Sequence, residues 1–183
     1  MTPPSTPPRT IAVAALTISI VLSACGEQEE AVTPYDRVGV PAVPDRTRPV
    51  SDGSPADGDY WATSITSTDD GLALVAQVGQ ALFDPTCTAE LGADACAEGY
   101  AVVDTPAAEL TIEPTDLVAV SVVASDRRNF AIDGAELLAL VSGSAPNAGA
   151  PDDYTYASYP FLVTVRNGTV VEARQIWLDT VTD

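Results

Sequence analysis

The chain has 183 residues, of which 26 are acidic and 8 basic, and its formal net charge is −18. Such a surface repels phosphate backbones and anionic lipid headgroups, so nucleic acid is excluded as an expected partner. Every basic residue is an arginine and there is no histidine, which also excludes Ser-His-Asp, Cys-His and Ser-Lys catalytic constellations.

Residues 1–24 have the pattern of a signal peptide. Arg9 precedes an apolar run at residues 11–22, which is too short to span a bilayer and leads into the sequence LSAC at residues 22–25. This tetrapeptide resembles the lipobox of bacterial lipoproteins. The resemblance implies that the signal is removed, that Cys25 carries a lipid, and that the protein is held on the extracytoplasmic face of the cell membrane. The alternative is an ordinary secretory signal that ends beside a chance cysteine.

Residues 25–56 have the composition of a flexible tether. They are rich in proline, glycine and charged residues, and no periodic apolar pattern runs through them. A chain of this length reaches about 100 Å when extended, enough to hold a domain away from the membrane. The alternative is that residues 35–56 pack on the domain as an edge segment, because proline-containing strands occur at sheet edges.

A single domain is expected over residues 57–183. Its first two strands flank the turn signal Asp69-Asp70-Gly71, and apolar residues alternate after the turn as one buried face requires. Further strands are expected at residues 100–104 and 117–125, and the second is apolar on both faces, as in a central strand. The alternating residues after the turn are Leu72, Leu74, Ala76 and Val78.

Cys87 and Cys96 remain as a pair once Cys25 is lipidated. An even pair of cysteines in an oxidising compartment predicts a structural disulfide. Metal binding is the alternative, but the chain has no histidine and no further cysteine to complete a ligand set.

The second half of the domain begins with a helix and ends in a β-hairpin. Asp133 can cap a helix over residues 134–142, with Glu136 completing a capping box, while Asn167-Gly168 is a favoured hairpin turn. The elements together predict an α+β fold. We expect a mainly antiparallel sheet of about five to seven strands, with the helix packed on one face.

Two stretches of the domain also resemble domains of unknown function that actinobacteria secrete or anchor to lipid. They are the Asp-Gly start of the first strand, at residues 57–58, and the closing YPFLVTVRNGTV hairpin, at residues 159–170. The resemblance covers residues 57–178 and depends on structural residues. It therefore implies a fold and carries no activity with it.

Carboxylates are the only acid–base groups of suitable pKa that the composition leaves for catalysis. A small hydrolase that uses a carboxylate pair on an envelope glycan is therefore an alternative function. No pair is singled out by its spacing, and Glu172 in the final strand is the one acid that the pattern suggests is buried.

Four acidic residues are weak candidates for a calcium site because carboxylates are hard oxygen ligands. None fits the spacing of an EF-hand loop, and Asp-Gly pairs are also what turns require. The sequence predicts no specific metal site and no cofactor, and weak Ca²⁺ binding stays an alternative. The four residues are Asp57, Asp59, Asp152 and Asp153.

Tyr154, Tyr156 and Trp177 are candidates for a ligand or partner surface, because aromatic rings on a sheet can stack on a sugar or form a protein hot spot. The alternative is that they fill a core in a chain with only 6% aromatic residues. The expected function is a non-enzymatic, lipid-anchored binding domain of the cell envelope, whose partner is a protein or a cell-wall component.

Overall fold

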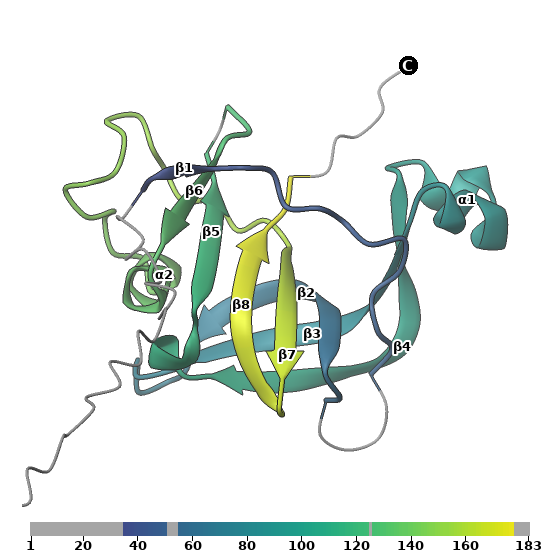
Figure 1. The fold of residues 1–183 in the computed structure, drawn as a ribbon, viewed down its shortest axis with the longest axis horizontal. Helices are drawn as coiled ribbons and strands as arrows, with labels where there is room; N and C mark the ends of the chain where they lie inside the picture. Colours follow the sequence, from purple (N-terminus) through teal and green to yellow (C-terminus); the bar gives the residue numbers. More distant parts are fainter. Residues whose placement is uncertain (1–34, 51–54, 125, 178–183) are drawn as a thin grey trace, which may run out of the picture. The chain divides into compact units, whose positions relative to one another are not determined.

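Within residues 35–50, 55–124 and 126–177, which the computed structural model describes, eight strands pair into one sheet in the order β1-β6-β5-β8-β7-β2-β3-β4 (Figure 1). The predicted α+β fold with a mainly antiparallel sheet is confirmed. All these residues belong to the unit Ala31–Asp183. The strands are β1 (Arg37–Val38), β2 (Gly58–Ser67), β3 (Leu74–Phe83), β4 (Tyr100–Ile112), β5 (Ala119–Val123), β6 (Asn129–Ile132), β7 (Phe161–Arg166) and β8 (Thr169–Gln175).

β2 and β3 form the predicted hairpin. Asp70 Oδ1 accepts hydrogen bonds from Thr68 Oγ1 at 2.6 Å and from Leu72 N at 3.1 Å, and Gly71 has φ +69°, which favours glycine. Leu72 is 72% exposed because it still belongs to the turn. The predicted alternation of buried residues therefore begins at Leu74, the first residue of β3, and not at Leu72. The buried residues of that alternation are Leu74, Ala76 and Val78.

β4 extends well beyond the strand expected at residues 100–104. It pairs with β3 from Phe83↔Tyr100 to Leu74↔Ile112, with one irregularity in register. Pro106 stands inside this strand. A proline is tolerated there because β4 is the last strand of the sheet and has a neighbour on one side only.

β5 lies between β6 and β8, the interior position predicted for residues 117–125. It runs antiparallel to β6 but parallel to β8, so this pair departs from the otherwise antiparallel pattern of the sheet. The C-terminal hairpin of β7 and β8 is confirmed. Its turn residues Asn167 and Gly168 both have positive φ, +52° and +77°, as a tight hairpin turn requires.

The helix α2 (Gly134–Val141) forms where the sequence predicts it. The Asp133 side chain caps it by accepting a hydrogen bond from Glu136 N at 2.7 Å. Leu137 is buried in the main core. The helix begins so close to the 3-10 turn η2 (Pro114–Asp116) that a Cβ at Gly134 would lie 2.1 Å from the Pro114 carbonyl oxygen, and only glycine fits there.

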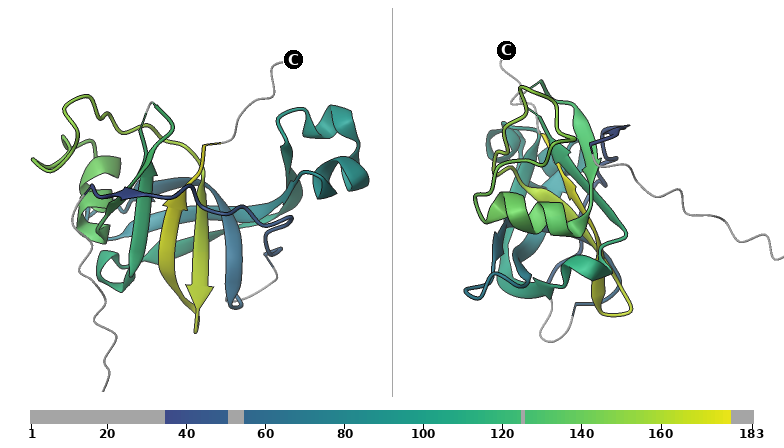
Figure 2. Two further views of the ribbon diagram at one scale, coloured as in Figure 1. Left: turned by 45° about the horizontal axis from the view of Figure 1, so that its top comes forward. Right: turned by 90° about the vertical axis from the view of Figure 1, so that its left-hand side faces the viewer.

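The sheet bends, and its strands share one main hydrophobic core that α2 covers at one end (Figure 2). This core takes residues from every strand between β2 and β8 and from α2. A second cluster packs on the other face of the sheet around Trp61, which is 1% exposed. Its buried residues are Trp61, Ala81, Phe83, Leu162 and Ile176.

A short helical excursion between β3 and β4 was not expected from the sequence. It consists of α1 (Thr86–Leu91) and the 3-10 turn η1 (Ala93–Cys96). The predicted disulfide is confirmed, since Cys87 and Cys96 are joined with an S–S distance of 1.98 Å. The bridge joins α1 to η1, and the packing of the two cysteines on Leu82 of β3 holds the excursion against the end of the sheet.

Residues 35–50, which we name the strap, lie on the sheet. For this stretch the predicted tether is wrong, and the alternative of a packed edge segment holds. At the first end β1 pairs with β6, Tyr35 is 6% exposed, and Tyr35 N donates to Ala131 O at 2.6 Å. β1 is also the strand that takes the sheet beyond the expected five to seven.

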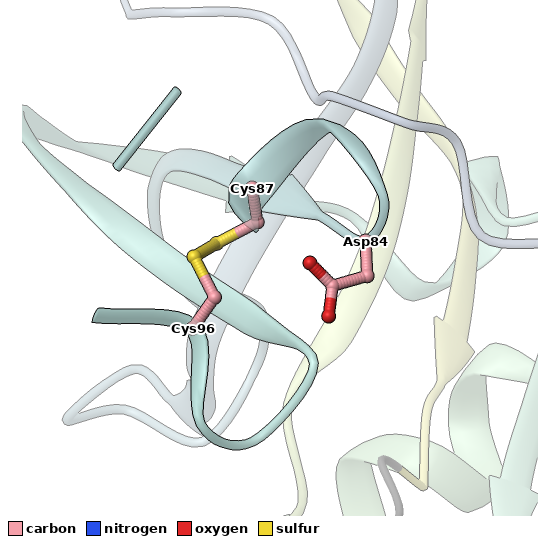
Figure 3. Close-up of side chains that lie close together, drawn as sticks. All are labelled: Asp84, Cys87 and Cys96. Carbon is pink, nitrogen blue, oxygen red and sulfur yellow. A yellow bond between two sulfur atoms is a disulfide. The ribbon is translucent and has the colours of Figure 1, made fainter. Parts of the chain in front are cut away.

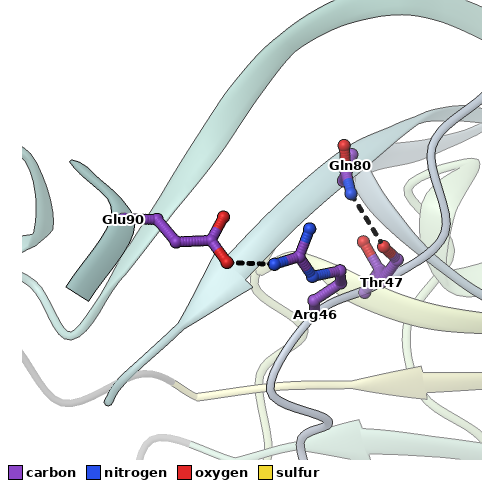
Figure 4. Close-up of polar contacts among 4 residues, drawn as sticks. All are labelled: Arg46, Thr47, Gln80 and Glu90. Carbon is purple, nitrogen blue, oxygen red and sulfur yellow. Dashed lines mark hydrogen bonds and ion pairs between the residues drawn. The ribbon is translucent and has the colours of Figure 1, made fainter. Parts of the chain in front are cut away.

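The second end of the strap fills the place where β2 and β3 separate, beyond their last pair at Trp61↔Gly79. Thr47 N donates to Ala81 O at 2.9 Å, and Ala81 N donates to Thr47 Oγ1 at 2.8 Å. Figure 4 shows two further contacts: Gln80 Nε2 donates to Thr47 O at 3.3 Å, and Arg46 pairs with Glu90 of α1. The strap is therefore part of the fold.

Candidate functional site

The predicted lipidation site, Cys25, lies outside the described residues, as do the rest of residues 1–34. Among the helices of the described ranges, none is both long enough and apolar enough to cross a membrane. Residues 51–54 of the predicted tether also lie outside the described part.

The disulfide lies beside a carboxylate. Asp84 and the two sulfur atoms all lie within 4.8 Å of one another (Figure 3), and this is the one such group of three potential ligands in the described residues. A disulfide sulfur offers no thiolate to a metal. Asp84 Oδ1 instead accepts hydrogen bonds from Thr88 N and Oγ1, at 3.0 and 2.7 Å, at the start of α1. The arrangement is structural.

The four acidic candidates do not come together as a ligand set. Asp57 Oδ1 accepts from Asn167 N at 2.7 Å, and Asp59 Oδ1 accepts from Thr164 Oγ1 at 2.6 Å, so both carboxylates fasten β2 to the C-terminal hairpin. Asp152 and Asp153 are exposed in the loop after α2. None of the four belongs to a group of three potential ligands within the described chain.

A polar hollow of about 630 Å³ lies at the β2–β3 turn and includes three acids, Asp69, Asp70 and Glu109. Glu109 accepts a hydrogen bond from Gln77 at 2.6 Å. Hydrogen bonds from Thr68 and from a backbone amide hold the pKa of the fully exposed Asp70 below its ordinary value. A general acid of a glycosidase needs a raised pKa, so Asp70 is unsuited to that role.

The three predicted aromatic residues do not form one surface. Tyr154 is 6% exposed and belongs to the main core, and Tyr156 packs against that core. Trp177 instead contacts Tyr159, with ring centroids 4.7 Å apart, and Arg127 lies 5.1 Å over its ring. Core packing, the alternative given for these residues, accounts for Tyr154 and Tyr156.

Tyr154 stands beside a buried polar clasp that holds the first end of the strap. Tyr35 donates its hydroxyl hydrogen to Glu136 Oε1 at 2.6 Å, and Asn147 N donates to the same oxygen at 2.9 Å. Burial, and then the Glu136 hydrogen bond and charge, raise the pKa of Tyr35. Burial is also the main cause that raises the pKa of Tyr154, and it raises the pKa of Tyr156 to about 12. The clasp fastens strap, helix and loop together.

A small aromatic cleft of about 170 Å³ lies at the end of β8, between Glu98, Tyr100, Tyr159 and Trp177. Burial raises the pKa of Tyr100, and the neighbouring Glu98 carboxylate raises it further. Aromatic faces beside a carboxylate are chemically suited to a sugar ring, which stacks on the rings and donates hydroxyl hydrogens to the acid.

A larger and more apolar groove lies beneath the middle of the strap. Its volume is about 360 Å³, and it is lined by residues 38–42 of the strap, residues 119–121 of β5, Ala131 of β6 and Arg174 of β8. Ser121 is 5% exposed, and its hydroxyl oxygen is buried without a hydrogen-bond partner among the described residues. An apolar pocket with few convergent polar groups is the usual form of a small-molecule site.

The groove is not predicted by any pattern in the sequence. The composition of residues 35–50 is that of a tether, which predicts no segment covering β5 and β8. Ser121 also has no neighbour in the sequence that marks it as functional. An apolar pattern at residues 38–43 was the one available signal. No family model, no curated protein and no solved structure matches the chain, so its function has to be argued from these sites.

Proposed function

We propose that this protein is a lipid-anchored, extracytoplasmic binding module without catalytic activity, and that the groove beneath the strap is its ligand site. The single observation that carries the binding role is the buried Ser121 hydroxyl, which has no hydrogen-bond partner among the described residues, in a mainly apolar groove. Leaving a buried hydroxyl unpaired costs about 1–3 kcal/mol, and a ligand that pairs with it recovers part of that free energy.

The proposed anchor is a lipid on Cys25, supported by the lipobox-like sequence LSAC at residues 22–25. Because the strap is fastened from Tyr35 onward, nine residues lie between Cys25 and Tyr35, and the chain takes ten residue steps from the anchor to the folded domain. Ten residues span at most about 35 Å, so the domain stays much closer to the membrane than a tether ending at residue 56 would allow.

The chemistry of the groove favours binding over catalysis. Among the described residues that line it, Arg174 is the one charged side chain, and a guanidinium has hydrogen-bond donors but no acceptor with which to take a proton from a ligand. The proposed module therefore holds a ligand and leaves it chemically unchanged.

The anchor is tested by the variant Cys25→Ala. We expect the wild-type protein in the membrane fraction and the variant in the soluble fraction or as an unprocessed precursor with no incorporated lipid. Cys87→Ala is a matched control, because it removes a thiol that the proposal assigns to the disulfide, and it should remain anchored. A Cys25→Ala protein that still incorporates labelled lipid would contradict the proposal.

The ligand site is tested by native mass spectrometry of small molecules that co-purify with the full chain. Ala119→Trp fills the groove from β5, and Trp177→Leu is the control because it alters the aromatic cleft instead. We expect a bound molecule in the wild type and in Trp177→Leu, and none in Ala119→Trp. Retention by Ala119→Trp, or no bound molecule in the wild type, would contradict the groove as the site.

A second candidate is binding of a sugar ring of the envelope in the aromatic cleft, favoured by the placement of Glu98 beside Tyr100, Tyr159 and Trp177. The same experiment separates the two candidates. A molecule that Trp177→Leu loses and Ala119→Trp retains would support the cleft.

A further inference from the structure

We propose that the groove beneath the strap binds a small molecule with an apolar body and a single carboxylate head, and that Arg174 pairs with the carboxylate. This inference rests on the groove being the ligand site, as proposed above. It adds the chemical class of the ligand and the residues that select it.

The apolar walls of the groove indicate that the main part of the ligand is apolar. Apart from Ser121 and Arg174, every lining residue is apolar or glycine. Val38 and Val40 of the strap are 36% and 69% exposed, and a ligand in the groove would cover part of this apolar surface. Each buried CH₂ group contributes about 0.8 kcal/mol, so a short aliphatic chain is enough for measurable binding.

Arg174 determines the head group of the ligand, because it is the one charged residue among the described residues that line the groove. Its Nη2 donates to Thr164 Oγ1 at 3.5 Å, a long hydrogen bond, and its Nε lies 3.3 Å from Glu172 Oε2. The contact between Arg174 Nε and Glu172 has the length of an ion pair but not the geometry of a hydrogen bond. Within the described chain, neither Nε nor Nη1 of Arg174 donates a hydrogen bond. The guanidinium therefore has donors to offer a carboxylate.

Ser121 supplies a second donor deeper in the groove. It pairs with Arg174 across β5 and β8, so the hydroxyl and the guanidinium come from neighbouring positions of the sheet. The hydroxyl oxygen lies beneath the strap, and no hydrogen bond holds residues 39–44 of the strap to the rest of the described chain. A ligand reaches Ser121 by moving this part of the strap outward, without breaking a hydrogen bond.

The charge of the whole chain limits the head to a monoanion. At −18 the surface repels anions at long range, and this repulsion grows with the charge of the ligand. Screening over about 8 Å at physiological ionic strength leaves the local attraction of Arg174 to dominate within the groove. A carboxylate is therefore favoured over a doubly charged phosphate.

The test uses the full chain in lipid nanodiscs, with hexanoate as the probe and hexanamide as its uncharged match. Binding is followed by the methyl resonances of Val38 and Val40, which line the groove, with empty nanodiscs as the blank for partition into lipid. We expect hexanoate to shift these methyl groups and to bind at least tenfold more tightly than hexanamide, since a charge-assisted hydrogen bond is roughly twice as strong as a neutral one. The methyl resonances of Val163 in the main core report whether each variant is folded.

Two substitutions beside the groove have opposite expected effects. Arg174→Gln removes the cation and should weaken hexanoate binding by about tenfold or more. Glu172→Gln removes the competing carboxylate and should strengthen it by roughly three- to tenfold. Neither change should alter hexanamide binding. A merely structural role of the Arg174–Glu172 pair predicts no gain of affinity in Glu172→Gln.

The outcomes separate the two proposals. Equal binding of hexanoate and hexanamide at the groove, unchanged by Arg174→Gln, would overturn the carboxylate inference and leave the groove as an apolar site. No shift of the Val38 and Val40 methyl groups with either probe, in a protein whose Val163 resonances are native, would overturn both.

Discussion

The two ends of the strap and its middle are held to the domain in different ways. At the first end Tyr35 bonds Glu136 and Ala131, and at the second end Thr47 bonds Ala81 twice, once through its backbone and once through its side chain. Residues 39–44 between them make no hydrogen bond within the described chain. The middle is retained by packing alone, with Pro41 buried and Val43 against the Trp61 cluster.

This difference separates stability from binding within one short segment. Hydrogen-bonded, buried ends fix the position of the strap, whereas a segment with few bonds opens at low free-energy cost. The groove lies under the part that opens most easily. The same segment therefore contributes to the fold at its ends and to the proposed ligand site at its centre.

The largest expected effect is alkaline unfolding through the first end. The folded state keeps the protons of Tyr35, Tyr154 and Tyr156, whose pKa values are raised above 10.0, after the unfolded state has lost them. These tyrosines therefore do not change the free energy of unfolding below about pH 10. Above about pH 10 each of them lowers it by about 1.4 kcal/mol per pH unit, until its own pKa in the folded state is reached. Urea unfolding between pH 8 and about 12 measures this decline, and Tyr35→Phe should make it shallower. An unchanged slope in Tyr35→Phe would show that the clasp does not titrate as described.

The next largest effect is expected from Tyr35→Ala. The change removes a buried ring and one hydrogen bond to Glu136, and it should lower the free energy of unfolding by about 3–5 kcal/mol. Val40→Ala in the middle of the strap is the matched control, with an expected loss under about 0.5 kcal/mol because Val40 is 69% exposed. Similar losses in the two variants would remove the distinction between end and middle.

Thr47→Val tests the second end with a nearly isosteric change. It deletes the oxygen that accepts from Ala81 N at 2.8 Å and leaves that buried amide unpaired, so we expect a loss of about 1–2 kcal/mol. Thr63→Val removes a hydroxyl that bonds Gln77 O at 3.3 Å on the surface, and chemical denaturation should show a loss under about 0.5 kcal/mol. If Thr47→Val were as mild as Thr63→Val, the second end would not be fastened through its side chain.

The smallest effect is expected from Gly39→Ala. A Cβ at this position meets no atom within 4 Å, and its φ is not in the left-handed region. The thermal midpoint should therefore stay within a few degrees of the wild type or rise slightly, because alanine restricts the unfolded chain. A large drop in a thermal melt would reveal contacts of the strap middle that the structure does not contain.

The sequence predicts the domain better than it predicts the site. The hairpin turns, the capped helix and the disulfide pair depend on neighbouring residues, so short-range patterns are sufficient to find them. The strap has no such pattern, because it crosses several strands and is held by scattered residues such as Tyr35 and Thr47. Its partners Glu136 and Ala81 lie 101 and 34 residues away, and separations of that kind leave no local signal.

The groove was missed for the same reason, since one of its walls is the strap. Tyr154 was expected at the surface, yet it is the ring against which Tyr35 packs, with centroids 5.2 Å apart. Tyr154 therefore lies next to the residues that hold the strap, but it is buried in the core and does not form a binding surface. The composition of the chain, which is acidic and poor in aromatic residues, does not show whether a given tyrosine is buried or exposed.

Native-state amide hydrogen exchange along the strap measures directly whether its ends are held and its middle is open. We expect slow exchange at Tyr35, Thr47 and Arg48, whose amides donate to Ala131, Ala81 and Asp59. We expect fast exchange at Val40 and Ala42, whose amides have no acceptor within the described ranges. Uniform protection from Tyr35 to Arg48 would contradict a strap that is fastened at its ends and open over the groove, as would uniformly fast exchange.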